Sequence, residues 1–223
     1  MKYTSIAIDG PSGAGKSTMA RRVAAELGFL YVDTGAIYRS VSLYAYRAGV
    51  DRNDAEMIVS LLPEIRIDMK YGDDGLQRMI LNGEDVSSAI RENEISLYTS
   101  AVSAIPAVRA FLLDLQRNLA ATRNVIMDGR DIGTVVLPDA SVKIYLTAAP
   151  EARAKRRWLE LREKGSDLTE AQVLEDVLQR DYNDTHREVA PLRQAEDAVL
   201  VDTTELDLEE SYQLLLRTVQ ERI

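Results

Sequence analysis

The stretch IAIDGPSGAGKST, residues 6–18, decides the fold of this chain. An apolar run over 3–8 is predicted as a short buried strand, which Asp9-Gly10 interrupts. Downstream, apolar residues recur at helical spacing as far as Leu27, and Gly28 is predicted to end that helix. The loop between them fits the pattern G-x-x-x-x-G-K-[ST] without a mismatch. A strand, a glycine-rich loop and a helix in this order predict a phosphate-binding loop.

Each residue type in this loop has a chemical reason. Gly10, Gly13 and Gly15 lack a Cβ atom, so successive backbone N–H groups can converge on phosphate oxygens. Lys16 can reach the β- and γ-phosphates of a nucleotide, and the hydroxyl of Ser17 can bind Mg²⁺. The alternative is a tight glycine turn with a surface lysine. The strand before the loop and the helix after it favour phosphate binding.

Length and composition limit the class of protein. The chain has 223 residues, 46% of them hydrophobic, which is enough for one sizeable α/β core. No run of about 18 apolar residues occurs, and the N-terminus lacks the apolar region of a signal peptide. The absence of cysteine excludes a disulfide framework and a cysteine metal site. The net charge of −9 repels nucleic acid and anionic membranes, so any bound anion needs a local basic cluster. We expect a cytoplasmic protein.

Four further apolar runs predict strands, and helical patterns lie between them. The strands are predicted over 29–32, 124–127, 142–146 and 198–201, and the helices over 36–47, 106–121, 150–163, 169–187 and 208–223. This alternation predicts an α/β fold with a doubly wound, five-stranded parallel sheet flanked by helices. In such a fold, ligands bind at the carboxyl ends of the strands.

One region breaks the alternation of strands and helices. Runs over 65–71 and 77–81 are predicted as paired strands around the turn at 72–75, and Asn82-Gly83 is a further turn signal. We therefore interpret 63–90 as a small β-rich insert in the main domain.

Charged residues follow the predicted strands at their carboxyl ends. Arg39 and Arg130 each come directly after a strand end and a glycine-containing turn, so we interpret both as phosphate ligands rather than parts of a solvated face. Asp128 ends an apolar strand, where P-loop enzymes place a carboxylate that orients Mg²⁺ and its waters. The alternative for Asp128 is a helix cap or turn. His186, the only histidine, is predicted to be exposed rather than a catalytic base.

Six stretches together resemble the bacterial cytidylate kinases, nucleoside monophosphate kinases that phosphorylate CMP and dCMP with ATP. They are GPSGAGKST at 10–18, VDTGAIYR at 32–39, NGEDVSSAIR at 82–91, DGRDIGTVVLPDA at 128–140, KIYLTAAPEARAKRR at 143–157 and RDYNDTHREVAPL at 180–192. The resemblance covers essentially the whole chain. It implies a single P-loop kinase unit over 1–223, with 63–90 as the β-rich part of a monophosphate-binding insert and 151–168 as a short mobile lid.

The resemblance also implies roles for individual residues. ATP is bound by Gly10, Pro11, Ser12, Gly13, Ala14, Gly15, Lys16, Ser17 and Thr18, together with the lid residues Arg156 and Arg157; Arg153 belongs to the same lid. The acceptor is bound by Thr34, Arg39 and Arg130 at its phosphate, by Ser100, Arg109 and Asp131 at the cytosine with Arg187 nearby, and by Arg180 and Asp184 at the sugar. Catalysis is assigned to Lys16, Asp128 and Arg130, and Mg²⁺ enters with ATP at Ser17.

Other classes of function stay open on the sequence alone. A P-loop kinase for UMP, dTMP, shikimate or gluconate is the nearest alternative, and the DGRDIG motif and the arginine spacing weigh against it. A nucleotide sensor or GTPase switch is a second, although the sequence contains no N-K-x-D guanine motif. For Asp131, reading the base and pairing with a nearby arginine both stay open. The expected partners are ATP and CMP or dCMP, with no nucleic-acid polymer and no membrane, and a monomer is expected.

Overall fold

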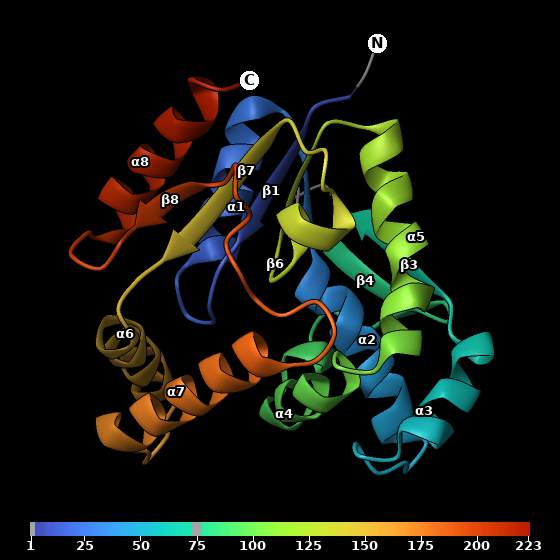
Figure 1. The fold of residues 1–223 in the computed structure, drawn as a ribbon. Coiled ribbons are helices and arrows are strands. Elements are labelled where there is room, and N and C mark those ends of the chain that lie inside the picture. The colour runs from blue at the N-terminus through green and yellow to red at the C-terminus, as the bar shows by residue number, and fades with distance from the viewer. Residues whose placement is uncertain (1–2, 73–76) are drawn as a thin grey trace. The chain divides into compact units, whose positions relative to one another are not determined.

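A five-stranded parallel sheet organises the fold in the order β2-β6-β1-β7-β8 (Figure 1). Its strands are β1 (Ser5–Asp9), β2 (Leu30–Asp33), β6 (Val125–Gly129), β7 (Val142–Thr147) and β8 (Val199–Asp202). Because β2 and β6 lie on one side of β1 while β7 and β8 lie on the other, the chain winds outward in both directions. The predicted doubly wound α/β fold is confirmed, and every predicted strand of this sheet is present within one or two residues at each end.

The computed structural model describes residues 3–72 and 77–223. The turn predicted at 72–75 therefore lies mostly outside the described residues. Packing divides the chain into two units, one formed by Met1–Tyr31 with Arg123–Ile223 and the other by Val32–Thr122. The boundary falls inside β2.

The first unit has its main core between the sheet and two helices. Those helices are α1 (Lys16–Leu27) and α8 (Leu208–Gln220). Apolar side chains of β1 and β7, such as Ile8 and Ile144, pack with side chains of both helices, such as Val23 and Leu215, in one buried cluster. Burial of this apolar surface fixes the sheet that carries the phosphate-binding loop.

The same core supplies a test of stability that lies outside the binding loops. Val219, near the end of α8, is completely buried in this cluster. Val219→Ala removes two methyl groups and leaves a cavity, so we expect it to lower the free energy of unfolding by about 2 kcal/mol. Chemical denaturation measures this loss. Binding at the predicted phosphate-binding loop should not change, and a change there would contradict the assignment of Val219 to the core alone.

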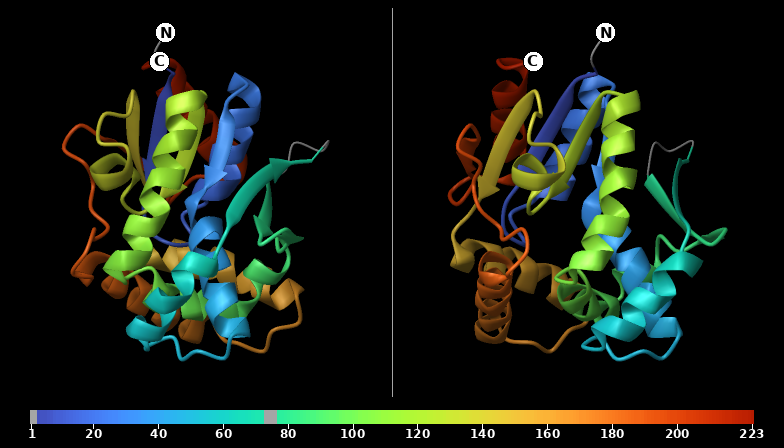
Figure 2. Two further views of the ribbon diagram at one scale, coloured as in Figure 1. Left: turned by 90° about the vertical axis from the view of Figure 1, so that its right-hand side faces the viewer. Right: turned by 45° about the vertical axis from the view of Figure 1, so that its right-hand side comes forward.

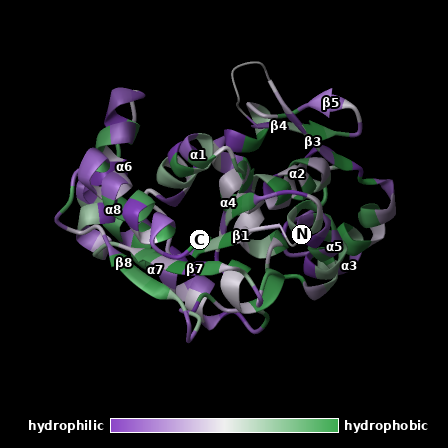
Figure 3. Ribbon diagram, turned by 90° about the horizontal axis from the view of Figure 1, so that it is seen from above, coloured by the Kyte–Doolittle hydropathy of each residue, from purple (hydrophilic) through white to green (hydrophobic). Residues whose placement is uncertain are grey.

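Two further helices of the first unit pack against each other. α6 (Pro150–Glu163) and α7 (Glu170–His186) lie side by side in Figures 1 and 2. Their contact is a small apolar cluster of Ala154, Val173 and Val177, and Trp158 packs against it. The rest of α6 is strongly charged and is mainly purple in Figure 3.

The second unit contains α2 (Thr34–Arg47), which packs against α4 (Asn93–Val102). Its other elements are α3 (Ala55–Leu61), η1 (Leu62–Glu64), β3 (Ile67–Tyr71), β4 (Gln77–Leu81), β5 (Glu84–Asp85), η2 (Ala89–Arg91) and α5 (Pro106–Thr122). The strands β3, β4 and β5 form a separate antiparallel sheet, which confirms the predicted β-rich character of 63–90. Asn82 and Gly83 both have positive φ and form the predicted turn between β4 and β5.

Two α-helices of the second unit, α3 and α4, were not predicted from the sequence. Among residues 3–72 and 77–223, no single helix is long and apolar enough to cross a membrane. The criterion is met only jointly by Glu94–Val102 and Pro106–Thr122, which are bent by 99° to each other.

Candidate active site

The phosphate-binding loop joins β1 to α1, as the sequence predicts. Gly13 and Gly15 have φ values of 77° and 82°, which L-residues with a Cβ atom rarely adopt. Gly10 is required for a different reason. A Cβ atom built there would lie 1.9 Å from the carbonyl oxygen of Leu146, so the loop starts in direct contact with the backbone of β7. At Gly28, which ends α1, φ is 66°, and this confirms the predicted helix end.

Lys16 is the first residue of α1 and is almost completely buried. Its Nζ donates a hydrogen bond of 2.6 Å to the carbonyl oxygen of Pro11, so the ammonium lies across the loop. Burial lowers the pKa of Lys16 to about 7, and the neighbouring charge of Arg130 acts in the same direction. Phosphate oxygens brought into the loop would favour the charged ammonium. The loop therefore has the residues and the positive charge to bind a polyphosphate.

A carboxylate at the end of β6 is held beside the start of α1. The Oγ of Ser17 donates to Oδ2 of Asp128 at 2.7 Å, and the hydroxyl of Tyr31 donates to Oδ1 at 3.0 Å. Asp128 lies inside β6 and is buried, so it is neither a helix cap nor a turn residue.

The pair formed by Ser17 and Asp128 fits Mg²⁺. Mg²⁺ prefers oxygen ligands, and in nucleotide sites it is usually held by one or two carboxylates together with phosphates and water. The described residues contain no group of three or more His, Cys, Asp or Glu side chains that could hold a metal.

Tyr31 was not singled out from the sequence, because no pattern links it to Asp128, 97 residues away.

Two ion pairs join the segment after β6 to α7 (Glu170–His186) and to Arg187, the residue directly after that helix. Nε of Arg130 donates to Asp184 at 2.6 Å, and Nη2 of Arg187 donates to Asp131 at 3.2 Å. All four side chains are less than one-fifth exposed. Burial opposes ionisation of Asp184, but the charges of Arg130, Arg180 and Arg187 together keep its pKa below the usual value. The structure thus brings together Arg130, Asp131, Asp184 and Arg187, which the sequence analysis assigned to the acceptor.

The predicted acceptor residues of the second unit gather at two places. Thr34 begins α2, and Arg39 one turn later donates from Nη2 to Asp33 at 3.0 Å. The Nε of Arg39 is buried and has no hydrogen-bond partner among the described residues, so an anion at this position would satisfy it.

The second place where predicted acceptor residues of this unit gather is around Arg109 of α5. Its Nη1 donates to the carbonyl oxygen of Ser103 at 3.2 Å, and its guanidinium lies 5.5 Å from the ring centre of Tyr38. Ser100 is half-buried on α4. The convergence of Arg39 and Arg130 on one phosphate stays a prediction, because the two residues belong to different units.

The three arginines of the predicted lid differ in their surroundings. Arg153 is buried and donates to the carbonyl oxygens of Ala148 and Ser12, and it pairs with Asp181 of α7. Arg156 donates to two carbonyl oxygens of the segment between β8 and α8, and Arg157 is exposed, 3.4 Å from Glu160. Arg153 therefore links α6 to the phosphate-binding loop and to α7, a role that its place in a charged run did not indicate. ATP binding by Arg156 and Arg157 stays a prediction.

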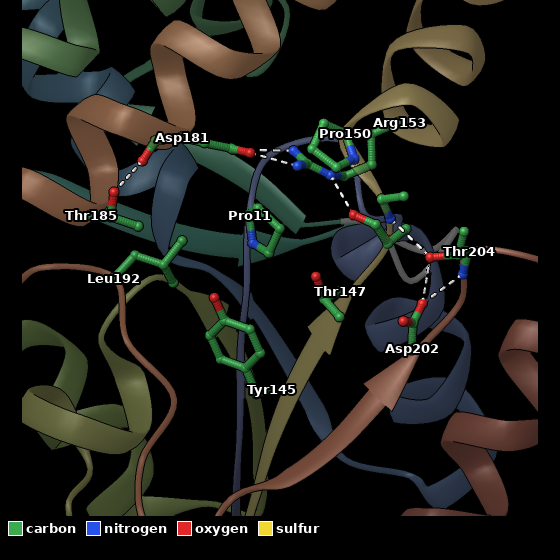
Figure 4. Close-up of a pocket in the computed structure, with 12 residues that line it drawn as sticks. Pro11, Tyr145, Thr147, Pro150, Arg153, Asp181, Thr185, Leu192, Asp202 and Thr204 are labelled. Carbon is green, nitrogen blue, oxygen red and sulfur yellow. Dashed lines mark hydrogen bonds and ion pairs between the residues drawn. The ribbon is translucent and has the colours of Figure 1, made fainter.

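A pocket of about 330 Å³ lies beside the phosphate-binding loop. Figure 4 shows Tyr145 and Thr147 on β7 at this pocket, with Pro11 and the ion-paired Arg153 and Asp181 around it. The pocket opens at the carboxyl end of the sheet, where ligands bind in parallel α/β folds.

His186 is exposed, as predicted, and stacks on Tyr182 with ring centres 4.0 Å apart. Its Nδ1 lies 3.0 Å from Oγ1 of Thr185 and 3.0 Å from the carbonyl oxygen of Tyr182, and neither contact indicates a catalytic base.

Comparison with known proteins decides the family. The family model for cytidylate kinase matches residues 6–221. The chain belongs to the cytidylate kinase family. A cytidylate kinase of Caldicellulosiruptor saccharolyticus is 50% identical over 97% of this chain and 95% of its own length. A cytidylate kinase of Carboxydothermus hydrogenoformans is 50% identical over 96% of each chain. The resemblance seen in the sequence motifs is thereby confirmed.

The solved structures support the fold alone. The crystal structure of an uncharacterized protein from Eubacterium ventriosum matches 99% of this chain and 100% of its own, with a TM-score of 0.55 and 12% identity.

Membership of the cytidylate kinase family makes this chain a nucleoside monophosphate kinase.

Proposed function

We propose that this chain transfers the γ-phosphoryl group of ATP to CMP and dCMP, giving CDP and dCDP. The observation that carries the proposal is the phosphate-binding loop, with Lys16 and the Ser17–Asp128 pair at the start of α1, in a chain of the cytidylate kinase family. The alternatives of a nucleotide sensor and of a kinase for another acceptor have no observation in their favour.

The donor is bound by Gly10–Thr18, with Arg156 and Arg157 from the 151–168 lid. The amides of the loop and Lys16 hold the β- and γ-phosphates and stabilise the charge that develops during transfer. Ser17 and Asp128 would hold Mg²⁺ and its waters. When bound, Mg²⁺ neutralises phosphate charge and helps to align the transferred group.

The acceptor is bound by the residues that the resemblance to the cytidylate kinases assigns to it. Arg39 and Arg130 bind its phosphate with Thr34, and Ser100, Arg109 and Asp131 bind the cytosine, with Arg187 nearby. Arg180 and Asp184 bind the sugar. The unsatisfied Nε of Arg39 supports an anion ligand there. The acceptor phosphate is ionised at neutral pH, so positioning and charge stabilisation suffice and no strong base is needed. The segment 63–90 belongs to the part of the chain that binds the monophosphate.

We also propose that the protein acts in the cytoplasm as a monomer, without nucleic-acid or membrane partners. The cysteine-free composition and the net charge of −9 support this proposal.

A coupled ADP-release assay tests the function directly. ATP and Mg²⁺ are supplied with CMP, dCMP, UMP, AMP or shikimate as the acceptor. CMP and dCMP should give the highest kcat/KM values. A higher value for UMP, AMP or shikimate, or ADP release that is independent of the acceptor, would reject the proposal.

Asp131 provides a test of base selection. An ionised carboxylate accepts hydrogen bonds only, so it can bind the 4-amino group of cytosine and repels the 4-carbonyl group of uracil. We expect Asp131→Ala to reduce the ratio of kcat/KM for CMP to that for UMP by roughly tenfold or more. Both values are measured with the same enzyme preparation, so a change in the folded fraction cancels.

The ion pair with Arg187 defines the opposite outcome. If Asp131 only orients Arg187, the variant loses activity toward CMP and UMP by the same factor. Base selection would then be assigned to Ser100 and Arg109.

A further inference from the structure

We propose that Asp9 is a positioning residue, which holds the Arg130–Asp131 segment in register with the start of the phosphate-binding loop. Asp9 is the last residue of β1, and Gly10 begins the loop directly after it. The proposal rests on the proposed function for its kinetic consequences, although the contact itself can be tested in the absence of substrate.

The carboxylate of Asp9 uses both of its oxygens on the segment that follows β6. Oδ1 accepts a hydrogen bond of 2.8 Å from the backbone N–H of Ile132, and Oδ2 accepts one of 2.7 Å from the backbone N–H of Gly133. The side chain is only 4% exposed, so water cannot replace it as an acceptor. These two amides are the first of the π-helical turn η3 (Ile132–Val136). Arg130 and Asp131 immediately precede them.

The packing around the contact leaves little freedom. A Cβ atom at Gly133 would lie 3.4 Å from Oδ2 of Asp9 and 3.2 Å from Cδ of Lys143. β1 also lies between β6 and β7 in the sheet, and it pairs with both over its length. Asp9 is therefore fixed in the sheet between its two neighbouring strands. A shift of η3 away from β1 would break at least one of the two hydrogen bonds to Asp9.

The charge on Asp9 is compatible with this role at neutral pH. Burial raises the pKa of Asp9 to about 6, while the two amide donors oppose that rise. The ionised carboxylate can accept from both amides at once, as the geometry requires. Its charge is opposed by Asp131 and favoured by Lys16, which lie on the two segments that Asp9 connects.

The consequence concerns the acceptor more than the donor. Asp184 of α7 forms an ion pair with Arg130. Arg187, directly after α7, forms an ion pair with Asp131. Asp9 holds the same short segment from the side of the sheet. If the turn shifted, the guanidinium of Arg130 and the carboxylate of Asp131 would move together. The loop amides and Lys16, which are built on β1 and α1, would stay where they are.

Asp9→Asn is the direct test. Asparagine has almost the same shape, but its NH₂ group cannot accept a hydrogen bond, so either Ile132 or Gly133 loses its acceptor. We expect kcat/KM for CMP to fall by roughly tenfold or more, mainly through a higher KM. The affinity for ATP, titrated without CMP, should change by less than about threefold, since the donor loop keeps its own contacts.

Val219→Ala is the matched control, because it destabilises the same unit from the core. It should lower the melting temperature and leave the KM for CMP unchanged. A purely structural role of Asp9 predicts that Asp9→Asn behaves in the same way, and that result would overturn the proposal. Equal losses in ATP affinity and in CMP affinity would overturn it as well.

Amide hydrogen exchange of the substrate-free enzyme separates this proposal from the proposed function. Exchange at Ile132 and Gly133 should be slow in the parent protein, and at least one of the two should exchange faster by about tenfold or more in Asp9→Asn. Unchanged exchange at both amides would refute the contact, whatever the acceptor assay shows. If the parent protein itself does not phosphorylate CMP while Asp9→Asn gives the expected exchange result, only the proposed function is rejected.

Gly133→Ala keeps the test decisive if Asp9→Asn does not fold. Its added methyl group would crowd Cδ of Lys143 at 3.2 Å and would touch Oδ2 of Asp9 at 3.4 Å, an ordinary van der Waals distance. A rise in KM for CMP that exceeds the change in ATP affinity supports the proposal. No rise, or an equal effect on ATP, contradicts it.

Discussion

Lys16→Ala should lower kcat by roughly a hundredfold or more and leave the protein folded. Lys16 is the one basic residue of the sequence 10–18, and on the proposed function its side chain brings a positive charge to the phosphates. Loss of such a contact removes stabilisation that is strongest in the transition state, and it costs on the order of 3 kcal/mol. The assay is ADP release at saturating ATP and CMP, followed with the circular dichroism of the same sample.

The stability of Lys16→Ala follows from the pKa of the lysine. Burial lowers that pKa from its usual value of 10.5 to about 7, so the folded state binds this proton less strongly than the unfolded state does. Between these two values, stability rises with pH, and at neutral pH the lysine contributes least. Removing it therefore should not lower the melting temperature at pH 7.

Arg222→Ala is the matched control for this variant. It removes an exposed cation of the same unit, which donates to the carbonyl oxygen of Thr218 and to the carboxylate of Glu221 near the end of the chain. This control should keep full turnover. A Lys16→Ala enzyme with near-normal kcat and a normal spectrum would reject the assignment of the loop to ATP.

The phosphate-binding loop could be predicted almost residue by residue, because its signals are local. Gly13, Gly15 and Gly28 have positive φ at the positions where the sequence calls for it, and the strand and the helix on either side follow their hydrophobic periods. For Gly10, the pattern predicted the need for a glycine but not the neighbour that requires it. Its close approach to Leu146 depends on β7 lying beside β1, and no local pattern contains that neighbour.

The two α-helices that were not predicted, α3 and α4, have apolar patterns that are short or mixed. α3 has only seven residues, so its periodicity is too brief to recognise, although Asp54 caps it as a helix signal should. α4 places Ile95, Tyr98 and Val102 on one buried face, and that spacing could have identified it.

The contacts that build the candidate site could not be derived from spacing. Arg130 and Asp184 are 54 residues apart, and Asp9 and Gly133 are 124 apart. Each contact depends on which elements become neighbours in the fold: β1 beside β6 for Asp9, α7 beside the segment after β6 for Arg130, and α6 beside α7 for Arg153. The sequence singled out the residues at strand ends because chemistry gathers there, but it could not pair them. The pairs of Arg153 with Asp181 and of Asp9 with η3 were missed for this reason.

Arg130→Lys should reduce kcat/KM for CMP by roughly a hundredfold while ATP affinity changes little. The guanidinium of Arg130 uses Nε on Asp184 and Nη1 on the carbonyl oxygen of Gly129 at 3.3 Å, and its planar fork carries further N–H donors. A lysine has one ammonium at the end of a flexible stem. Asp184, at 2.6 Å from the present Nε, would attract that ammonium and draw it away from an acceptor phosphate. Charge is conserved, so the loss measures geometry rather than net charge.

Arg39→Lys should act in the same direction, because Arg39 also has a carboxylate partner, Asp33, and its buried Nε has no hydrogen-bond partner within residues 3–72 and 77–223. Arg22→Lys is the matched control: Arg22 pairs with Glu209 on the surface at 2.7 Å, and the same substitution there should leave both substrates unaffected. Titration of ATP and of CMP separately distinguishes the two possible sites. If Arg130→Lys weakened ATP binding as much as CMP binding, Arg130 would belong to the donor site, and the phosphate of the acceptor would depend on Arg39 alone.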